Sequence, residues 1–159
     1  MLNSQKLRKL KKLRKYGKLK KLKKLKKLKT IVMSFSFKDI IAWQKAHQFV
    51  LLVYKVTKNF PEWERYGLCS QFQRAAVSIA ANIAEGYKKL SKADKLRLMN
   101  VAQGSLEECR YYVLLSKDLG YIPENAYLCL NNSIEETSKF LNLYCKAITN
   151  DAGPKKDTL

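Results

Sequence analysis

The sequence predicts an all-α fold, an up-down-up-down antiparallel four-helix bundle preceded by a disordered leader rich in Lys and Leu. Three observations predict it. Apolar residues recur at the three- and four-residue spacing of a helix face in four successive segments. Residues that begin or end helices stand between these segments, and no stretch alternates apolar and polar residues as a half-buried strand does. Helices joined by such short connections pack naturally as an up-and-down bundle.

The first two helices are predicted at 37–58 and 66–87. Ser36, followed three residues later by Asp39, has the pattern of a capping box, and Pro61 disfavours helix in the residue before it. The expected buried face of the first helix is Ile40, Trp43, Ala46, Val50, Val53 and Thr57, flanked by Phe49 and Tyr54. The expected buried face of the second helix is Phe72, Ala76, Ile79 and Ile83.

The third helix is predicted to run from an N-cap at Ser91 to about Asp118, and the fourth to begin at Pro123-Glu124. Gly120 is the expected stop between them. Gly104 in mid-helix costs about 1 kcal/mol relative to Ala, so we expect a close helix crossing there. The buried faces are expected to be Leu96, Met99, Ala102, Leu106, Cys109 and Val113 in the third helix, and Ile134, Thr137, Leu141, Tyr144 and Ile148 in the fourth.

The stretch 71–86, QFQRAAVSIAANIAEG, is the segment around which we expect the bundle to be organised, because its alanines allow neighbouring helices to approach closely. Arg74, Ser78, Asn82 and Glu85 fall on one polar stripe of this helix. The stripe either faces an RNA or protein partner or satisfies polar groups between helices or subunits. We favour the second interpretation, since Glu85 would repel phosphate, and expect Glu85 to pair with an Arg of a neighbouring helix or subunit.

Several motifs in and around this stretch carry a family resemblance. They are RAAVSI at 74–79 and NIAEG at 82–86, with YGL at 66–68, AQGS at 102–105 and LGY at 119–121. On these motifs, residues 35–148 resemble the bacterial four-helix-bundle family first noted as proteins encoded in intervening sequences of large-subunit ribosomal RNA genes. The chain is also similar to the accessory variability protein of diversity-generating retroelements. Gln73 and Ala80 depart from the family pattern, which often has Arg and Pro at these places.

The resemblance implies a non-enzymatic binding or scaffold protein. The retroelement relatives form pentameric rings that bind a reverse transcriptase and nucleic acid. The resemblance therefore implies a homo-oligomer, ring-like and pentameric, with RNA or DNA bound at weak sequence preference and a reverse transcriptase as a further partner.

The formal net charge of +19 is concentrated at the N-terminus. The leader, residues 1–32, holds 15 of the 32 Lys and Arg and no acidic residue, so the remainder carries a net charge of +4. Leucines on a three-residue period drift around a helix and form no lasting apolar face. The leader is interpreted as a nucleic-acid tail, as a membrane-surface peptide or, as we favour, as a translated tandem repeat before a true start at Met33. The expected divisions are this disordered leader, a bundle at 33–150 and a frayed tail at 151–159.

Basic residues are expected to gather at one end of the bundle. In an up-and-down bundle, the start of the first helix, the turn between the second and third, and the end of the fourth share one end. The predicted nucleic-acid-binding residues at that end are Lys88, Lys89, Lys92, Lys95 and Arg97, offset locally only by Asp94, with Lys38 and Lys146 nearby. The alternative function is that of a membrane-surface-active protein driven by the cationic leader.

No catalytic, metal or cofactor site is predicted. His47 is the only histidine and has no obvious nucleophile beside it, and the Glu107-Glu108 and Glu135-Glu136 pairs lack the histidines that a di-iron bundle normally uses. No segment approaches the roughly 20 apolar residues of a membrane span. The four scattered cysteines are interpreted as reduced, core-facing thiols of a cytoplasmic protein, namely Cys69, Cys109, Cys129 and Cys145.

Overall fold

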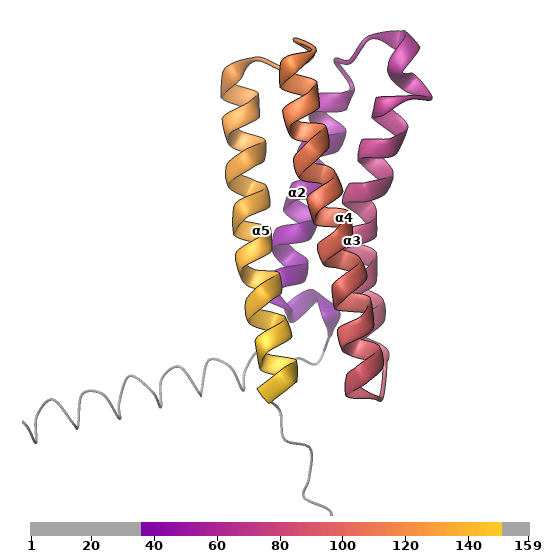
Figure 1. Ribbon diagram of the computed structural model, residues 1–159, viewed down its shortest axis with the longest axis vertical. Coiled ribbons are helices and arrows are strands. Elements are labelled where there is room, and N and C mark those ends of the chain that lie inside the picture. The colour runs from indigo at the N-terminus through magenta and orange to yellow at the C-terminus, as the bar shows by residue number, and fades with distance from the viewer. Residues whose placement is uncertain (1–35, 151–159) are drawn as a thin grey trace, which may run out of the picture. The chain divides into compact units, whose positions relative to one another are not determined.

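The computed structural model of the protein describes residues 36–150, and four long helices account for most of them (Figure 1). They are α2, Ile41–Thr57; α3, Leu68–Lys88; α4, Lys92–Asp118; and α5, Glu124–Asn150. Two short 3₁₀ turns, η1 at Phe37–Asp39 and η2 at Glu62–Arg65, precede α2 and α3. The described residues contain no strand. The predicted all-α four-helix fold is confirmed.

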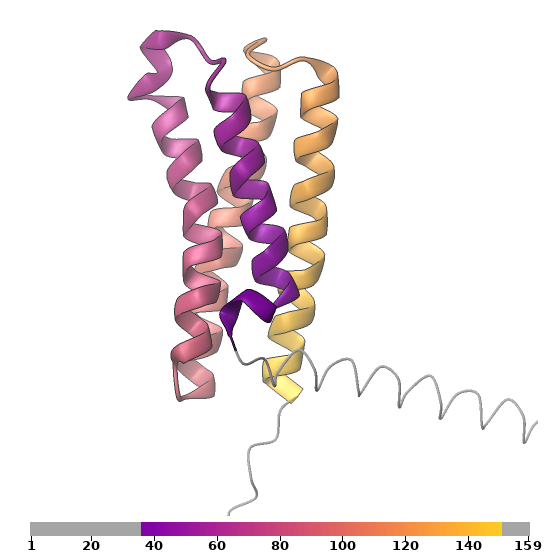
Figure 2. The ribbon, with the colours of Figure 1, turned by 180° about the vertical axis from the view of Figure 1, so that it is seen from behind.

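Each helix runs antiparallel to the next along the chain, and α5 returns to pack against α2 (Figure 2). The four helices therefore enclose one core, with α2 diagonal to α4 and α3 diagonal to α5. The largest wholly buried side chains come from all four helices and include Phe49, Phe72, Met99, Leu106 and Leu141.

The start of the first helix differs from the prediction. Ser36 and Asp39 do form the expected capping box, but it caps the 3₁₀ turn η1, and Ile40 then adopts an extended conformation (φ −73°, ψ 115°) before α2 begins at Ile41. The break lets Ile40 turn into the core, where it is 1% exposed. Phe37 meanwhile packs edge-on against Trp43, with ring centroids 5.0 Å apart.

The buried face of α2 is also rotated from the expected one. Phe49, predicted as a flanking residue, is wholly buried, whereas Trp43 and Val50 are half-buried and Tyr54 is 42% exposed. The core residues of the helix are Ala42, Ala46, Phe49, Val53 and Thr57. Both stripes have helical spacing, and the packing of α3 and α5 on α2 selects between them.

The other three helices bury the faces that their spacing predicts. All of the residues expected for α3 and α5 are buried, and in α4 only Leu96 is half-buried instead. α3 begins at Leu68, two residues later than predicted, because η2 occupies Glu62–Arg65 just before it. Its N-terminus is capped from that turn, since Glu64 Oε2 accepts a hydrogen bond from the Leu68 amide at 2.9 Å.

The close helix crossing lies at a glycine other than the predicted one. A Cβ added at Gly104 would meet nothing within 4 Å, so no helix approaches it, and that expectation was wrong. A Cβ added at Gly86 would lie 2.6 Å from Met99 Cε and 3.6 Å from Leu98 Cβ. Gly86 is thus the position at which α3 and α4 come close together.

The predicted signals on either side of α4 are confirmed. Ser91 is its N-cap, with Oγ accepting from the Asp94 amide at 3.0 Å. At the other end Gly120 has a φ of +71°, and the Tyr121 amide donates to the Ser116 carbonyl at 2.9 Å, the bond that closes a Schellman motif. α5 then starts at Glu124, directly after Pro123.

The cysteines are free thiols, but they do not all face the core. Cys69 and Cys109 are buried, Cys145 is half-buried and Cys129 is exposed, so the expectation for Cys129 was wrong. Burial raises the pKa of the Cys69 thiol, and the nearby Glu64 carboxylate raises it further. The expectations for the leader, 1–32, and the tail, 151–159, fall outside the described residues.

Candidate nucleic-acid interface

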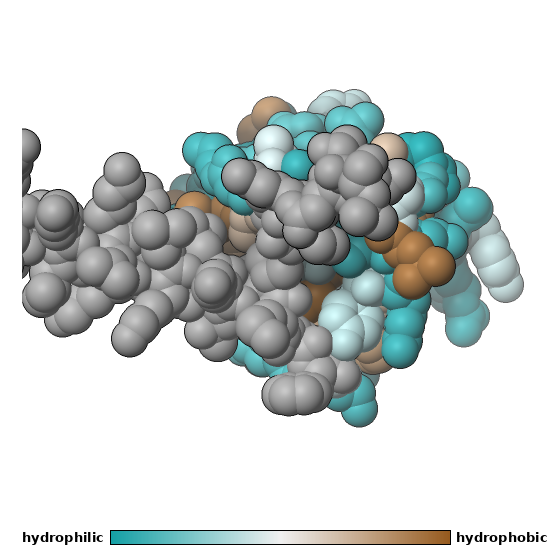
Figure 3. All heavy atoms as spheres, turned by 90° about the horizontal axis from the view of Figure 1, so that it is seen from below, coloured by the Kyte–Doolittle hydropathy of each residue, from teal (hydrophilic) through white to brown (hydrophobic). Residues whose placement is uncertain are grey.

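The end of the bundle that carries the turn between α3 and α4 gathers basic residues. α3 ends at Lys88 and α4 begins at Lys92, so the five predicted nucleic-acid-binding residues lie in one turn and the helical residues beside it. The start of α2 and the end of α5 lie at the same end (Figure 1), which adds the exposed side chains of Lys38 and Lys146. Seen from this end, the surface outside the grey atoms is mostly hydrophilic (Figure 3).

Two of the five predicted residues are engaged within the bundle. Lys89 Nζ lies 2.9 Å from Glu85 Oε1, one turn before it. Lys92 Nζ donates a 2.6 Å hydrogen bond to the carbonyl of Thr149, among the last carbonyls of α5, where a positive charge is favourable. Lys92 therefore ties the start of α4 to the end of α5, and both side chains are less available for phosphate than the sequence suggests.

The other three residues present positive charge to solvent. Lys88, Lys95 and Arg97 make no ion pair with any residue in the range 36–150, and Lys88 Nζ lies 5.5 Å from the ring centroid of Tyr87. Lys88 and Arg97 are exposed and Lys95 is half-exposed. These three residues are called the basic end below.

Two acidic residues, not one, lie beside the basic end. Asp94 is held by the helix cap, because Ser91 Oγ donates to Asp94 Oδ2 at 2.6 Å. Glu85, which the prediction did not count as a local acid, is matched by Lys89. Neither carboxylate forms an ion pair with Lys88, Lys95 or Arg97 in the part of the chain that is described.

The middle of the polar stripe lies at the seam between α3 and α4. Ser78 Oγ and Ser105 Oγ are 2.9 Å apart, which links the two helices. Asn82 Nδ2 donates to the Ser78 carbonyl at 2.8 Å and to its Oγ at 3.1 Å. Ser78 and Asn82 thus satisfy polar groups inside the bundle, as a structural stripe requires.

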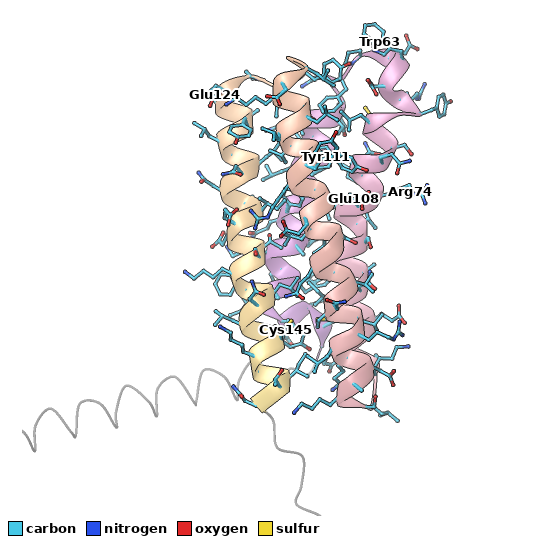
Figure 4. All side chains as sticks on the ribbon, viewed as in Figure 1. Trp63, Arg74, Glu108, Tyr111, Glu124 and Cys145 are labelled. Atoms are coloured by element: carbon cyan, nitrogen blue, oxygen red, sulfur yellow. The ribbon has the colours of Figure 1, made fainter. Side chains whose placement is uncertain are left out.

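The two charged members of the stripe behave differently from its middle. Arg74 is exposed and extends outward from α3 (Figure 4), and it makes no ion pair within the described range. Glu85 pairs with Lys89 of its own helix, so the expected Arg partner from a neighbouring helix is not the one found.

The family of the chain follows from its sequence pattern together with this fold. Residues 38–143, from η1 into α5, match the family described as 23S rRNA-intervening sequence proteins. The chain belongs to this family. No curated protein matches the chain in sequence.

A solved structure supports the same assignment for this intervening-sequence protein. It is the crystal structure of a protein of unknown function from the S23 ribosomal protein family of Bacteroides thetaiotaomicron. The two chains are 27% identical with a TM-score of 0.63, over 69% of this chain and 98% of that one. The similarity thus covers nearly the whole of the relative, and neither description names a catalytic activity.

The Glu107-Glu108 and Glu135-Glu136 pairs are engaged by ion pairs and a hydrogen bond. Arg110 pairs with both Glu107 and Glu135, and Lys45 pairs with Glu136 at 3.1 Å. No group of three His, Cys, Asp or Glu that could hold a metal ion occurs within residues 36–150. The hydrogen bond that Tyr112 donates to Glu108 is the main cause that raises the pKa of Tyr112 to about 12.

His47 lies on the surface of α2 in this intervening-sequence protein. Its ring is exposed and stacks on Trp43, with centroids 5.0 Å apart and an interplanar angle of 6°.

A membrane span would need a longer or more apolar helix than any found between residues 36 and 150.

Two exposed apolar features of this family member were not predicted from its sequence. Leu90, in the turn between α3 and α4, is fully exposed beside the basic end. Trp63 and Tyr66, at η2 on the opposite end, are 77% and 89% exposed. No periodicity marks such positions, because they lie in turns. The available signal was the presence of two aromatic residues, Trp63 and Tyr66, between Pro61 and Gly67 and outside the predicted apolar stripes.

Proposed function

We propose that this intervening-sequence protein is a non-enzymatic cytoplasmic helical bundle that binds nucleic acid through its basic end. The observation that carries the proposal is the set of three cationic side chains, Lys88, Lys95 and Arg97, at one end without an acidic partner in the described chain. Cationic side chains that neutralise phosphates release counterions, which supplies binding with little sequence preference. The family description, which links these proteins to a 23S rRNA gene, and the free thiols support the proposal.

The proposal is tested with a 20-base-pair RNA or DNA duplex titrated at several salt concentrations. Each neutralised phosphate contributes about −0.9 to the slope of log affinity against log salt on a duplex. Lys88→Ala combined with Arg97→Ala is therefore expected to flatten the slope by roughly 1.8 and to weaken all sequences alike.

The matched control carries Lys55→Ala and Lys139→Ala, which remove the same charge from exposed positions on α2 and α5. This variant is expected to keep the slope of the full chain nearly unchanged. Equal slopes for the two double variants would contradict binding at the basic end. Deleting residues 1–32 then separates the alternative function, since binding to anionic vesicles that disappears with the leader would assign membrane activity to that segment.

The proposal includes self-association into a ring-like homo-oligomer, which the family resemblance suggests as a pentamer. Exposed apolar side chains on α4 support it, because Val101, Tyr111 and Leu114 are 43%, 58% and 48% exposed. Aromatic side chains such as that of Tyr111 are enriched where one protein surface contacts another. A reverse transcriptase is a further proposed partner on the same family resemblance.

Sedimentation velocity of the full chain at tens of micromolar tests self-association. We expect a single species heavier than the 18.4 kDa chain, and a Val101→Glu variant is expected to shift it toward the monomer. Lys139→Glu, an exposed change on α5, is the control and should leave the species unchanged. A monomer at that concentration would contradict this part of the proposal.

A further inference from the structure

A groove runs between α2 and α3 at the end of the bundle opposite the basic end. Two adjoining hollows of about 480 and 510 Å³ form it, and Tyr54, Arg65 and Gln73 line both. The first continues along Lys58, Phe60 and Glu62, and the second along Tyr66, Arg74 and Val77. Volumes of this size suit a ligand with several ring-sized units.

The groove carries unneutralised positive charge. Lys58, Arg65 and Arg74 line it and make no ion pair with any residue from 36 to 150. Glu62 is the acidic residue in the lining. The carboxylate of the neighbouring Glu64 is engaged in hydrogen bonds within the bundle. Its Oε1 accepts from the Tyr121 hydroxyl at 3.1 Å, and its Oε2 accepts from the Leu68 amide. The lining therefore complements a polyanion.

Exposed aromatic rings lie in the lining of the groove, at Tyr54 and Tyr66, and in the turn η2 beside it, at Trp63. Trp63 and Tyr66 are 77% and 89% exposed, and Tyr54 in the lining is 42% exposed. Trp63 belongs to η2 and Tyr66 is the C-cap of that turn, so the two rings are three residues apart at the same end of the bundle. Figure 4 shows Trp63 at one end of the bundle and Arg74 extending outward from α3.

The turn that presents these rings is firmly held. Pro61 begins it with a φ of −53°, and the Glu64 amide donates to the Pro61 carbonyl at 2.9 Å. Phe60, 8% exposed, packs on Tyr121 with ring centroids 5.4 Å apart. The lining of the groove is also held in place, because Gln73 Nε2 of α3 donates a 2.8 Å hydrogen bond to Thr57 Oγ1 of α2. Binding would therefore require little ordering of the protein.

From this combination we infer that the α2–α3 groove binds single-stranded nucleic acid, with bases stacked on Tyr66 and Trp63 and phosphates on Lys58, Arg65 and Arg74. Exposed aromatic rings beside a basic groove are the elements that bind single strands, because every base has a face that stacks. A duplex keeps its bases stacked inside and cannot use the rings. The site is separate from the basic end and does not depend on it.

The fluorescence of Trp63 can report binding directly. The chain has two tryptophans, so the substitution Trp43→Phe makes Trp63 the one remaining tryptophan. The experiment titrates the full chain carrying Trp43→Phe with a 12-nucleotide oligouridylate, the matching oligothymidylate and an abasic 12-mer. We expect the first two to quench Trp63 fluorescence and the abasic strand, with the same phosphates, to leave it unchanged. The RNA and DNA arms show which sugar the site prefers.

Tyr66→Ala removes one stacked base and is expected to weaken the affinity, measured by Trp63 fluorescence, by roughly 5- to 150-fold, whereas Tyr66→Phe should retain it. Glu62→Gln should strengthen binding, and Arg65→Ala with Arg74→Ala should weaken it. Far-ultraviolet circular dichroism of each variant verifies that the bundle is intact.

Three outcomes would overturn the inference. They are equal quenching by the abasic strand, equal affinity of Tyr66→Ala and Tyr66→Phe, and quenching or a blue shift of Trp63 that depends on protein concentration without nucleic acid. The last would assign the groove to a second copy of the chain. Duplex binding that responds to Lys88 and Arg97 would persist in each case, so failure here is distinct from failure of the basic end.

Discussion

Replacing Phe72 with alanine is expected to lower the free energy of unfolding by about 3–5 kcal/mol. The Phe72 side chain is wholly buried in α3, and its ring centroid lies 6.4 Å from that of Phe49 on α2 and 5.8 Å from that of Tyr112 on α4. The shortened side chain would leave a cavity at the meeting point of three helices, which packed neighbours refill only in part.

Urea denaturation followed by circular dichroism, at one fixed protein concentration, measures this loss. Tyr66→Ala serves as the control because it removes an aromatic ring that is 89% exposed, and its effect should stay within about 0.5 kcal/mol. A Phe72→Ala loss as small as that of the control would mean that the centre of the core lies elsewhere.

Valine at Gly86 is expected to destabilise the bundle by about 1–3 kcal/mol, whereas the same substitution at Gly104 should leave its stability nearly unchanged. A Cβ added at Gly86 would lie 3.6 Å from Leu98 Cβ and 3.7 Å from the Lys95 carbonyl oxygen, so the branched methyl groups of valine would push α4 away from α3. At Gly104 the added atoms enter open space.

Thermal and urea unfolding measure the stabilities of Gly86→Val and Gly104→Val. A third variant, Gly104→Ala, tests the same position further. Gly104→Ala is expected to stabilise the protein by up to about 1 kcal/mol, because alanine favours helix and meets no neighbour. A larger loss at Gly104 than at Gly86 would contradict the position of the crossing, and it would point instead to a contact on the exposed face of α4.

Features that depend on neighbours in the chain were predictable. The caps at Ser36 and Ser91 and the stop at Gly120 are set by residues within one helical turn of each site. The buried faces of α3 and α5 could be predicted because, at a period of 3.6 residues, the apolar residues of each helix fall on a single face. The gathering of basic residues at one end followed from the topology, since four antiparallel helices bring alternate connections together.

The candidate sites were less predictable, because they depend on partners distant in the sequence. Lys92 is engaged by Thr149, 57 residues away, and no local pattern distinguishes it from Lys88. The groove combines Tyr54 of α2 with Arg65 and Arg74 from the following turn and helix. Tyr54 was predicted beside a buried face and Arg74 in a polar stripe, and no local pattern connects them.

The sequence by itself determined that four amphipathic helices form an up-and-down bundle with a basic end, because helical periodicity and capping are local properties. Only the tertiary structure decided that Phe49 instead of Trp43 faces the core of α2 and that Gly86 instead of Gly104 marks the close approach of α3 and α4. It also decided which lysines remain unpaired. The physical reason is that two stripes or two glycines of equal local propensity differ only in what the neighbouring helix places against them.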